Sequence, residues 1–518
     1  MPVSPTYPGV YVQEISSGVR TVSGVPTSVA AFLGRARRGL VNEPTTCFNM
    51  GEFNRRFGGL WLDGPMSYAV DDFFANGGGE CVIVRLFEPD AQPNIDGIAT
   101  ADFPAAFVLA AASPGDWGNQ LTATVTIPDD NDGLAQAAAK YGLTSADLFD
   151  LAILDAATGA VEVYRNLTSV AESERRIDRV LLDQSSLAHC QAPPSGKPVA
   201  DVVQFAGGND GKGLADATFE GDIANKTGLY ALKKTDIFNM LCVPPDVRGG
   251  DLPQSVRNAA LALCKAERAL FIVDPPVLWD ANPDTAASKA QSEQLANPLV
   301  PLADADYAAL FFPRLIKRDV LRGGQTDVFP PCGAVAGVIA RTDVNRGVWK
   351  APAGIAATLS NTDGLTVKLT DEENGLLNPI AINCLRTFPN IGRVIWGSRT
   401  MKGSDQLSDD YKYVPVRRLA LFIEESLFRG TQWVVFEGND EPLWAQIRLS
   451  VGAFMQRLFR QGAFQGTAPR DAYFVKCDSE TTTPDDINRG IVNIVVGFAP
   501  LQPAEFVIIS IQQIRNAA

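Results

Sequence analysis

The sequence of 518 residues has one histidine, no closely spaced pair of cysteines and no long apolar run. Its eight cysteines are never closer than 22 residues, and only Cys190 lies beside the single histidine, His189. Structural zinc needs four Cys or His ligands, which usually arrive in close pairs, so this spacing excludes a zinc-binding module. The pattern instead predicts scattered, buried thiols in a reducing compartment.

The sequence also lacks a membrane-spanning apolar run and an excess of basic residues, and these absences exclude membrane and nucleic-acid partners. The longest apolar stretches, Cys332–Ala340 and Phe103–Ala112, fall well short of the roughly 20 residues that span a bilayer. Residues 1–8 show no basic region followed by an apolar one, which predicts the absence of a signal peptide and residence in the cytoplasm. A formal net charge of −14 repels phosphates and anionic lipid, so we expect no nucleic acid and no membrane insertion.

Catalytic motifs are equally scarce. A Ser-His-Asp arrangement would have to use His189, and no serine stands in a G-x-S-x-G elbow. The glycine-rich stretch Gly207–Gly213 fails as a phosphate loop because Ala206 and Gly213 occupy positions that need Gly and Ser or Thr. We therefore expect no cofactor and no enzyme activity. The alternative is a hydrolase built on the α/β part, residues 229–375, with His189 in its site.

What the sequence does contain is an ordinary globular composition with an uneven charge. Hydrophobic residues make up 46% and charged residues 20%, and the length suits about three or four domains. Residues 89–375 hold 23 basic and 37 acidic side chains, whereas residues 1–88 hold 7 and 8, and residues 376–518 hold 15 and 14. The net negative charge thus lies in the middle, which suggests that the two near-neutral ends fold together. The alternative is that acidity only tracks solvent-exposed domains.

Periodicity predicts a mixed α/β (α+β) protein of several domains. A β-α-β layout covers residues 27–88, short β runs such as Leu121–Ile127 follow, and an α/β rhythm with a helix over Pro253–Arg268 begins near residue 229. Residues 281–298 are expected to form an exposed loop. The strand and helix spacing after residue 229 favours parallel pairing.

Two amphipathic helices dominate the C-terminal part. The first carries its apolar residues at helical spacing between Val416 and Leu427, and a strand is expected to follow over Gln432–Phe436. The second begins at Asn439-Asp440-Glu441-Pro442, which supplies a cap, an early acid and a proline in the first turn. Its wheel leaves Arg457 and Arg460 on the face opposite the apolar one.

Both termini are predicted to end in strands that lack a nearby partner. The N-terminal run is Val10-Tyr11-Val12-Gln13-Glu14-Ile15, and the C-terminal run, Glu505–Ile511, includes Val507, Ile509 and Ile511. Unpaired backbone N–H and C=O groups must be paired in their own sheet or donated to a neighbour's sheet.

Several stretches resemble one family of proteins. They include Tyr7–Glu14, Thr27–Gly34, Phe73–Gly78, Ser113–Asn119, Phe271–Pro276, Gly333–Gly337, Arg346–Gly354, Leu376–Pro379 and, most specifically, Val414–Trp444 with Phe436-Glu437-Gly438-Asn439-Asp440-Glu441-Pro442-Leu443-Trp444. The sequence resembles the contractile tail sheath proteins of phage tails, R-type bacteriocins and contractile injection systems. The likeness runs nearly end to end and is weakest over residues 120–230 and 281–300.

The resemblance implies a structural subunit. Family members stack as hexameric rings around an inner tube and contract to drive the tube through a target envelope, and they also meet baseplate and tail terminator proteins. Strands donated by the terminal arms link their subunits. The implied organisation is an N-terminal arm (1–20), an inner tube-facing domain (21–88 and 376–500), an inserted β-rich outer domain (89–228), an α/β sheath domain (229–375) and a C-terminal arm strand (501–518).

The resemblance also implies roles for single residues. Val10, Tyr11, Val12 and Ile15, with Val507, Ile509 and Ile511, would lie in the intersubunit strands. Arg457 and Arg460 would face the tube as a weak electrostatic grip. The alternative for this arginine pair is a solvated helix face, which is the usual place for charged side chains.

Overall fold

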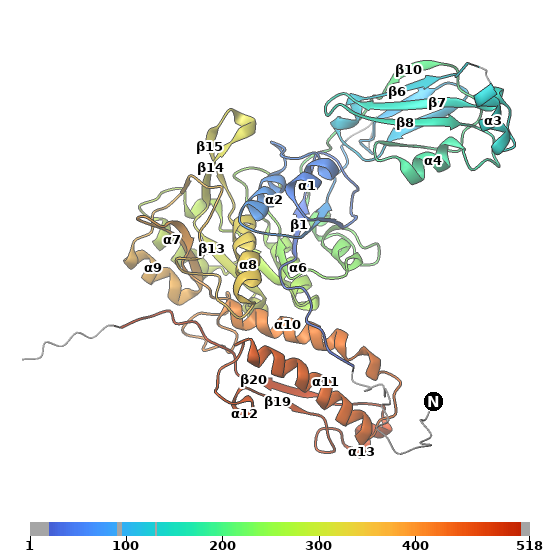
Figure 1. The fold of residues 1–518 in the computed structure, drawn as a ribbon. Coiled ribbons are helices and arrows are strands. Elements are labelled where there is room, and N and C mark those ends of the chain that lie inside the picture. Colours follow the sequence, from blue (N-terminus) through green and yellow to red (C-terminus); the bar gives the residue numbers. More distant parts are fainter. Residues whose placement is uncertain (1–19, 91–95, 130–131, 509–518) are drawn as a thin grey trace, which may run out of the picture. The chain divides into compact units, whose positions relative to one another are not determined.

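The computed structural model describes residues 20–90, 96–129 and 132–508, and it divides into two compact units (Figure 1). The C-terminal unit consists of residues 20–27, 346–351 and 413–508, and the sheet unit consists of the described residues of 28–345 and 352–412. The C-terminal unit therefore joins residues from both ends of the chain.

The sheet unit is built on an eight-stranded sheet with the order β18-β17-β13-β12-β11-β1-β3-β2. The strands from β17 to β3 run parallel to their neighbours, and the edge strands β18 and β2 are antiparallel. Their bounds are β1 (Ala30–Gly34), β2 (Thr45–Cys47), β3 (Cys81–Arg85), β11 (Met240–Cys242), β12 (Leu270–Val273), β13 (Ala308–Phe312), β17 (Ile382–Phe388) and β18 (Gly392–Ile395). Central strands such as β1 and β3 are buried along their whole length, as parallel strands covered on both faces must be.

Helices cover both faces of this sheet. Alternate residues of β1 point to opposite sides: Ala31 and Leu33 join the core under α6 (Gln254–Ala266) and α7 (Ala286–Ala296). On the other side, the rings of Phe32 and Phe73 lie 5.6 Å apart and bring in α2 (Pro65–Ala75), and α8 (Cys332–Arg346) contacts β11 there. The predicted β-α-β unit and the predicted helix over 253–268 are confirmed within a few residues.

One expected domain boundary differs from the structure. The expected inner domain joins residues 21–88 with 376–500, but β1 and β3 lie in the parallel sheet beside β11, and β17 and β18 extend the same sheet. The balance of basic and acidic residues reflects which segments are exposed to solvent. Strand pairing depends instead on apolar runs, which need a neighbouring strand on each side. Only residues 20–27 of the N-terminal part belong with residues 413–508.

Two local expectations are wrong. Residues 281–298 contain helix α7, whose Ala286, Ala287 and Ala290 are buried in the core; this alanine-rich segment has strong helix propensity in spite of its polar residues. In place of the expected strand over Gln432–Phe436, the chain forms a 3-10 turn at Gln432–Val434, and this segment pairs with no strand of the described residues.

The inserted segment is rich in β-strands, as expected. Two antiparallel sheets, β10-β6-β7-β8 and β4-β5-β9, enclose one apolar core. Their bounds are β4 (Thr100–Phe103), β5 (Phe107–Ala111), β6 (Leu121–Thr126), β7 (Phe149–Asp155), β8 (Ala160–Leu167), β9 (Ala188–Cys190) and β10 (Asp201–Gln204), with helices α3 (Asp132–Lys140) and α4 (Ile177–Gln184). The alternating burial of β6 and β7 is typical of strands with one face on a core.

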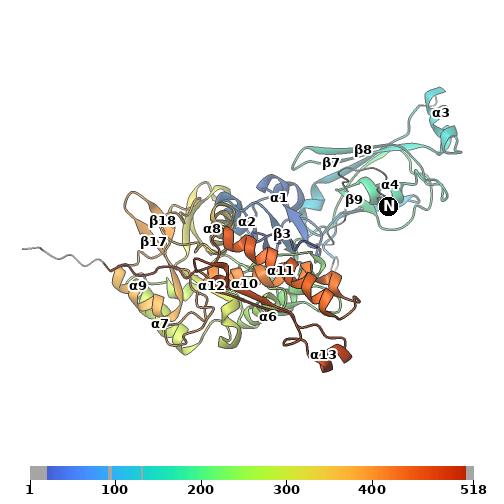
Figure 2. The same ribbon diagram turned by 60° about the horizontal axis from the view of Figure 1, so that its bottom comes forward.

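The C-terminal unit contains two long helices and a two-stranded sheet. Helices α10 (Val414–Gly430) and α11 (Glu441–Arg460) lie side by side in both ribbon views (Figures 1 and 2). Their apolar faces form one core, which also buries Val22 from the N-terminal part. Both helices match the prediction, and Asp440 caps α11 by accepting a hydrogen bond from the Leu443 N–H group.

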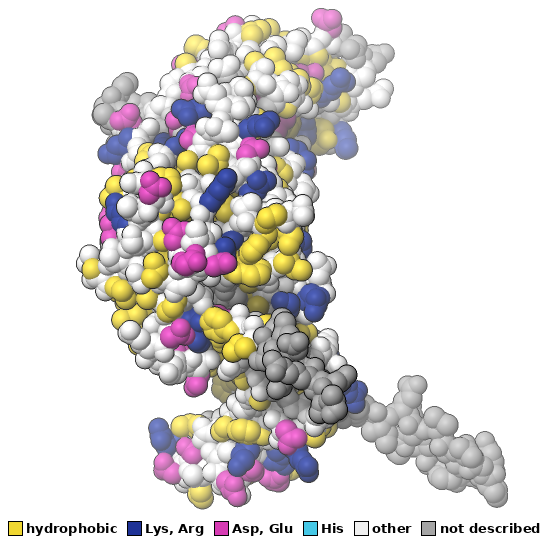
Figure 3. Space-filling model, turned by 90° about the vertical axis from the view of Figure 1, so that its left-hand side faces the viewer, with side chains coloured by type: hydrophobic (Ala, Val, Ile, Leu, Met, Phe, Trp, Pro, Cys, Tyr) yellow, Lys and Arg dark blue, Asp and Glu magenta, His cyan; other side chains and the backbone are white. Residues whose placement is uncertain are grey.

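The chain has a formal net charge of −14, and Figure 3 shows how charged side chains are distributed on one face. On the face drawn in Figure 3, basic and acidic side chains are interspersed with hydrophobic ones. Neighbouring charges of opposite sign largely cancel over a screening length, so this face offers contacts of mixed chemistry.

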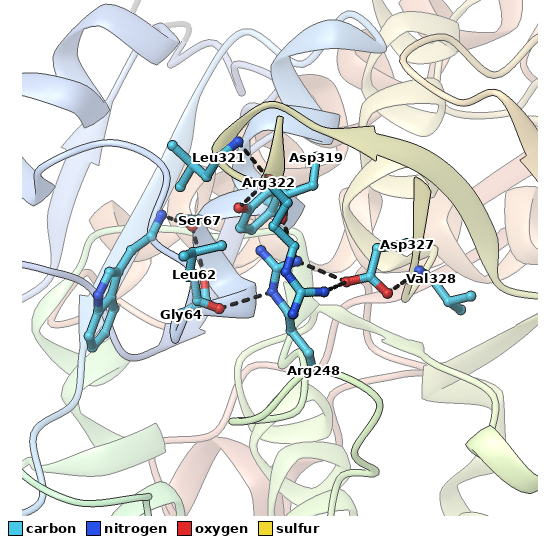
Figure 4. Close-up of polar contacts among 11 residues, drawn as sticks. Leu62, Gly64, Ser67, Arg248, Asp319, Leu321, Arg322, Asp327 and Val328 are labelled. Carbon is cyan, nitrogen blue, oxygen red and sulfur yellow. Dashed lines mark hydrogen bonds and ion pairs between the residues drawn. The ribbon is translucent and has the colours of Figure 1, made fainter. Parts of the chain in front are cut away.

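An ion-pair cluster fastens the hairpin formed by β14 (Leu315–Asp319) and β15 (Gln325–Phe329) (Figure 4). Arg248 donates to Asp319 at 2.6 Å, to Asp327 at 3.0 Å and to the Leu62 carbonyl at 2.9 Å. Its guanidinium lies 4.5 Å from the ring centroid of Tyr68, whose hydroxyl donates to Asp319. A planar, forked cation suits this combination of carboxylates and an aromatic face.

Beside this cluster, Lys317 and Asp72 form a buried ion pair at 2.6 Å. Burial raises the pKa of Asp72 to about 6, and the Lys317 cation limits the rise. Between about pH 4 and 6 the folded chain holds this proton more tightly than the unfolded chain. The contribution of Asp72 to the free energy of unfolding therefore falls as the pH rises through that window.

Replacing Lys317 with methionine is expected to lower the free energy of unfolding by about 3–5 kcal/mol at neutral pH, because it leaves the Asp72 carboxylate buried without its cation. The pKa of Asp72 then rises further, so the loss should be smaller at pH 5, where the carboxyl group is protonated, than at pH 8. Urea unfolding at the two pH values measures the difference. The control is Arg318→Met on the same strand, whose side chain is exposed; equal losses for both variants would contradict the prediction.

Candidate functional site

The small sheet of the C-terminal unit has unpaired strand edges. It consists of β19 (Tyr473–Lys476) and β20 (Val495–Phe498), which pair antiparallel with each other and with no other strand among the described residues. Two-stranded sheets are marginal on their own, and each strand here presents an open edge.

The ladder register shows which groups face outward. The Ala499 N–H donates to the Ala472 carbonyl at 2.8 Å, and hydrogen-bonded pairs alternate along an antiparallel ladder. The hydrogen-bonded pairs of the sheet are therefore Phe474 with Gly497 and Lys476 with Val495. The backbone groups of the intervening β20 residues, Val496 and Phe498, point away from β19 and into the open edge.

The core beneath this sheet is only partly covered. Across the ladder, Tyr473 faces Phe498 and Val475 faces Val496, and all four side chains pack on the α10–α11 core while staying partly exposed. The same holds for a larger group of apolar side chains: Trp349, Phe422, Leu427, Trp433, Val434, Phe459, Val492 and Ile494. An apolar core of this kind gains stability when further chain segments cover it.

After β20, the chain continues into an apolar and exposed segment. Phe506, Val507 and Ile508 are 75%, 81% and 90% exposed, and residues 501–508 form no strand. Glu505 accepts a hydrogen bond from the Tyr413 hydroxyl at 3.2 Å. Of the expected arm residues, only Val507 is described; Val10, Tyr11, Val12, Ile15, Ile509 and Ile511 lie outside the described residues.

The two arginines expected to face the tube differ in their surroundings. Arg457 donates through Nη2 to the Val22 carbonyl at 2.6 Å, and its guanidinium lies 5.5 Å from the Phe454 ring centroid. Both arginines are exposed, and Arg460 stands three residues later at the end of α11. The contact with Val22 has no local signature in the sequence, because that residue is 435 positions away along the chain.

The histidine considered for the alternative function, a hydrolase, lies apart from the α/β part of the fold. His189 lies in β9 of the β-rich insertion, opposite Ala110, and outside the α/β part, residues 229–375; burial lowers its pKa. Within the described ranges, no group of three or more His, Cys, Asp or Glu side chains could hold a metal ion. Among the same residues, no helix is long and apolar enough to cross a membrane.

The thiols behave as the sequence predicted. Cysteines are free, and all but the half-buried Cys190 are buried. Desolvation raises the pKa of the buried Cys47 and Cys384 thiols, to about 11 and about 12. Thiols held neutral in this way act as small apolar side chains and not as nucleophiles.

Comparisons with known proteins give this fold a class. The chain matches a contracted sheath complex of an extracellular contractile injection system, PVC, at TM-score 0.58 and 21% identity, over 99% of both chains. It matches the contracted helical sheath of the anti-feeding prophage at TM-score 0.56 and 22% identity, over 98% of this chain and 100% of that one. A crystal structure of a sheath tail protein from Listeria innocua matches at TM-score 0.61 and 14% identity, over 93% and 96%. The fold is thus that of contractile sheath proteins.

Sequence relatives agree with that class. Residues 230–401 match the family model of the phage tail sheath protein central domain, and residues 406–514 match that of the phage tail sheath C-terminal domain. The tail sheath protein of Salmonella phage ViI is 27% identical over 30% of this chain and 24% of its own length. A prophage major tail sheath protein of Pseudomonas aeruginosa is 25% identical over 49% and 54%. The chain belongs to the contractile tail sheath family, and these alignments span a quarter to about half of the curated relatives.

Proposed function

We propose that this protein is the structural subunit of a contractile sheath, which polymerises as stacked hexameric rings around an inner tube. The observation that carries the proposal is the unfinished β19–β20 sheet, with open edges above a partly covered apolar core. Strands donated by the terminal arms of neighbouring copies, residues 1–20 and 501–518, would pair with these edges and cover that core. The exposed apolar segment around Val507 suits the donor role.

Strand donation also suits a lattice that changes shape. Backbone ladders keep subunits linked while the connecting segments rotate, whereas packed side-chain contacts must break and re-form. The work of contraction would come from contacts made between subunits in the shorter state, without nucleotide. The solved relatives include a helical sheath and a baseplate complex, both described in the contracted state. We accordingly propose self-assembly, association with baseplate and tail terminator proteins, and residence in a phage tail or injection particle assembled in the bacterial cytoplasm.

Negative-stain electron microscopy of the purified full-length protein tests the proposal. We expect hollow tubes with helical or ring periodicity, alone or together with an inner tube protein. A protein that stays monomeric in both conditions, across the concentrations at which sheaths polymerise, would contradict it.

Arg460 remains our proposed contact to the inner tube, with Arg457 as its partner. Because Arg457 also binds the Val22 carbonyl, its replacement would disturb the fold, and Arg460→Glu is the cleaner variant. We expect weaker co-sedimentation of the tube protein with this variant, most clearly at low salt, where charge screening is least. Arg489→Glu, at another exposed arginine of the unit, is the control. Unchanged co-sedimentation would identify Arg460 as part of an ordinary solvated helix face.

A further inference from the structure

The loop between α10 and α11 places a phenylalanine in an unusual position. Phe436 is fully exposed, and its backbone has a φ of 70°. The left-handed region is sterically unfavourable for a bulky side chain and is normally occupied by glycine or asparagine. Exposing an aromatic ring to water adds a second cost, since burial of its apolar surface would stabilise the chain.

The loop around Phe436 is not loosely held. The Glu437 N–H donates to the Val434 carbonyl at 3.1 Å. On the other side, the Asn439 side chain donates to the Ile491 carbonyl and accepts from the indole N–H of Trp444, both at 2.9 Å. The surrounding bonds thus impose the left-handed backbone at Phe436 and hold its ring in the solvent. Strain that the fold maintains in this way is typical of binding positions.

Charges near Phe436 indicate the chemistry of its partner. Glu441 pairs with Arg448 and Asp440 caps α11, whereas the carboxylate of Glu437 is half-exposed and lies 4.0 Å from the Arg20 guanidinium. A fitting partner is an apolar surface with a basic rim, because such a surface buries the ring and pairs the exposed Glu437 carboxylate.

The outer face of the β19–β20 sheet is a surface of this kind on the same chain. Phe474 is half-exposed and lies over Gly497, which has no side chain to cover it, and Val495 beside it is 43% exposed. Lys476 is exposed on the same face, across the ladder from Val495, and Arg470 precedes the strand with its side chain 89% exposed.

We propose that Phe436 of one copy packs on the outer face of the β19–β20 sheet of a second copy, with Glu437 near Lys476 and Arg470. The inference rests on the proposed sheath function and concerns a different surface from strand donation, which uses the sheet edges. A contact between two different patches of one chain is heterologous, so each copy leaves both patches open to further copies and the contact propagates. Buried aromatic anchors commonly supply much of the energy of such contacts.

The test is Phe436→Asn in the full-length protein. Asparagine accepts the left-handed backbone, so the isolated subunit is expected to unfold at the same temperature as the parent or higher. The protein concentration needed for tube formation is expected to rise at least tenfold, measured by sedimentation and electron microscopy. The control is Leu449→Asn, which removes an exposed apolar side chain from α11 and should leave assembly unchanged.

A charge exchange locates the contact. Glu437→Lys should weaken assembly, and adding Lys476→Glu in the same chain should restore it at least in part. Tubes formed by Phe436→Asn at the parent's concentration would overturn the inference. So would tubes that form normally but no longer enclose the tube protein, since Phe436 would then contact that protein. Failure of the parent itself to form tubes would instead count against the sheath function.

Discussion

A chain in which Val496 is replaced by proline is expected to fold normally and to form no tubes. The Val496 N–H points into the open edge of β20, so proline removes a donor that only an added strand would use. Proline is tolerated on edge strands, and the pairing of β20 with β19 uses the groups of Val495 and Gly497. Loss of the accepting edge should therefore abolish assembly while the melting temperature changes by only a few degrees.

The control for this variant is Val496→Thr, which keeps both the β-branched shape and the N–H group and should form tubes. Deleting residues 1–18 tests the donor side and should likewise leave folded monomers. Light scattering, sedimentation and negative-stain images measure all three proteins. Long, regular tubes from the proline variant would show that β20 receives no strand, and long tubes from the deletion would show that the N-terminal arm is not needed.

The second large effect is expected at Gly333, where even alanine should strongly destabilise the fold. A Cβ atom at this position would overlap the Ala69 carbonyl group and lie 2.8 Å from the Ala69 Cα, because α8 and α2 cross with their backbones in contact. Gly337, one turn later, is as close to α2: its Cβ would lie 2.7 Å from the Asn76 Cβ. Since backbone cannot rotate away as a side chain can, Gly333→Ala should lower the free energy of unfolding by about 3 kcal/mol or more.

The matched control is the same substitution in another helix. Nothing lies within 4 Å of a Cβ atom at Gly375 in α9 (Asp371–Leu377), so Gly375→Ala should stabilise the protein by up to about 1 kcal/mol. Urea unfolding of both variants gives opposite signs if the helix contact is as tight as described. A soluble Gly333→Ala protein with unchanged unfolding would show that α8 can move away from α2.

Local elements were predictable from the sequence, and the pairing of distant ones was not. Helical spacing and caps located α6, α10 and α11 because those signals lie within one segment. One partner of β1, strand β11, lies more than 200 residues away, and the charge balance between distant segments indicated the wrong group. Helix α7 was missed because its polar composition resembles that of a loop, although its alanines are good helix formers.

In the candidate site, too, local features were predictable and contacts between distant residues were not. The apolar character of Val507 and its neighbours is visible in the sequence, but the open edge of β20 becomes visible only once β19 is known to be its sole partner among the described strands. The bond from Arg457 to Val22 could not be predicted, since no local pattern marks it. Phe436 did carry a signal, because an aromatic residue directly before Glu-Gly-Asn-Asp stands in a turn where small or polar residues are usual.

The route of the chain from residue 20 into the sheet unit has a mechanical consequence. Residues 20–27 lead directly to β1, which lies between β3 and β11 and pairs with both in parallel. A pull applied at Arg20 along the axis of β1 would load the hydrogen bonds on both sides of the strand at once, in shear. Bonds loaded together resist far more force than bonds opened one after another. The connection of the N-terminal segment to the middle of the sheet, and not to an edge strand, therefore lets the subunit transmit tension without unravelling.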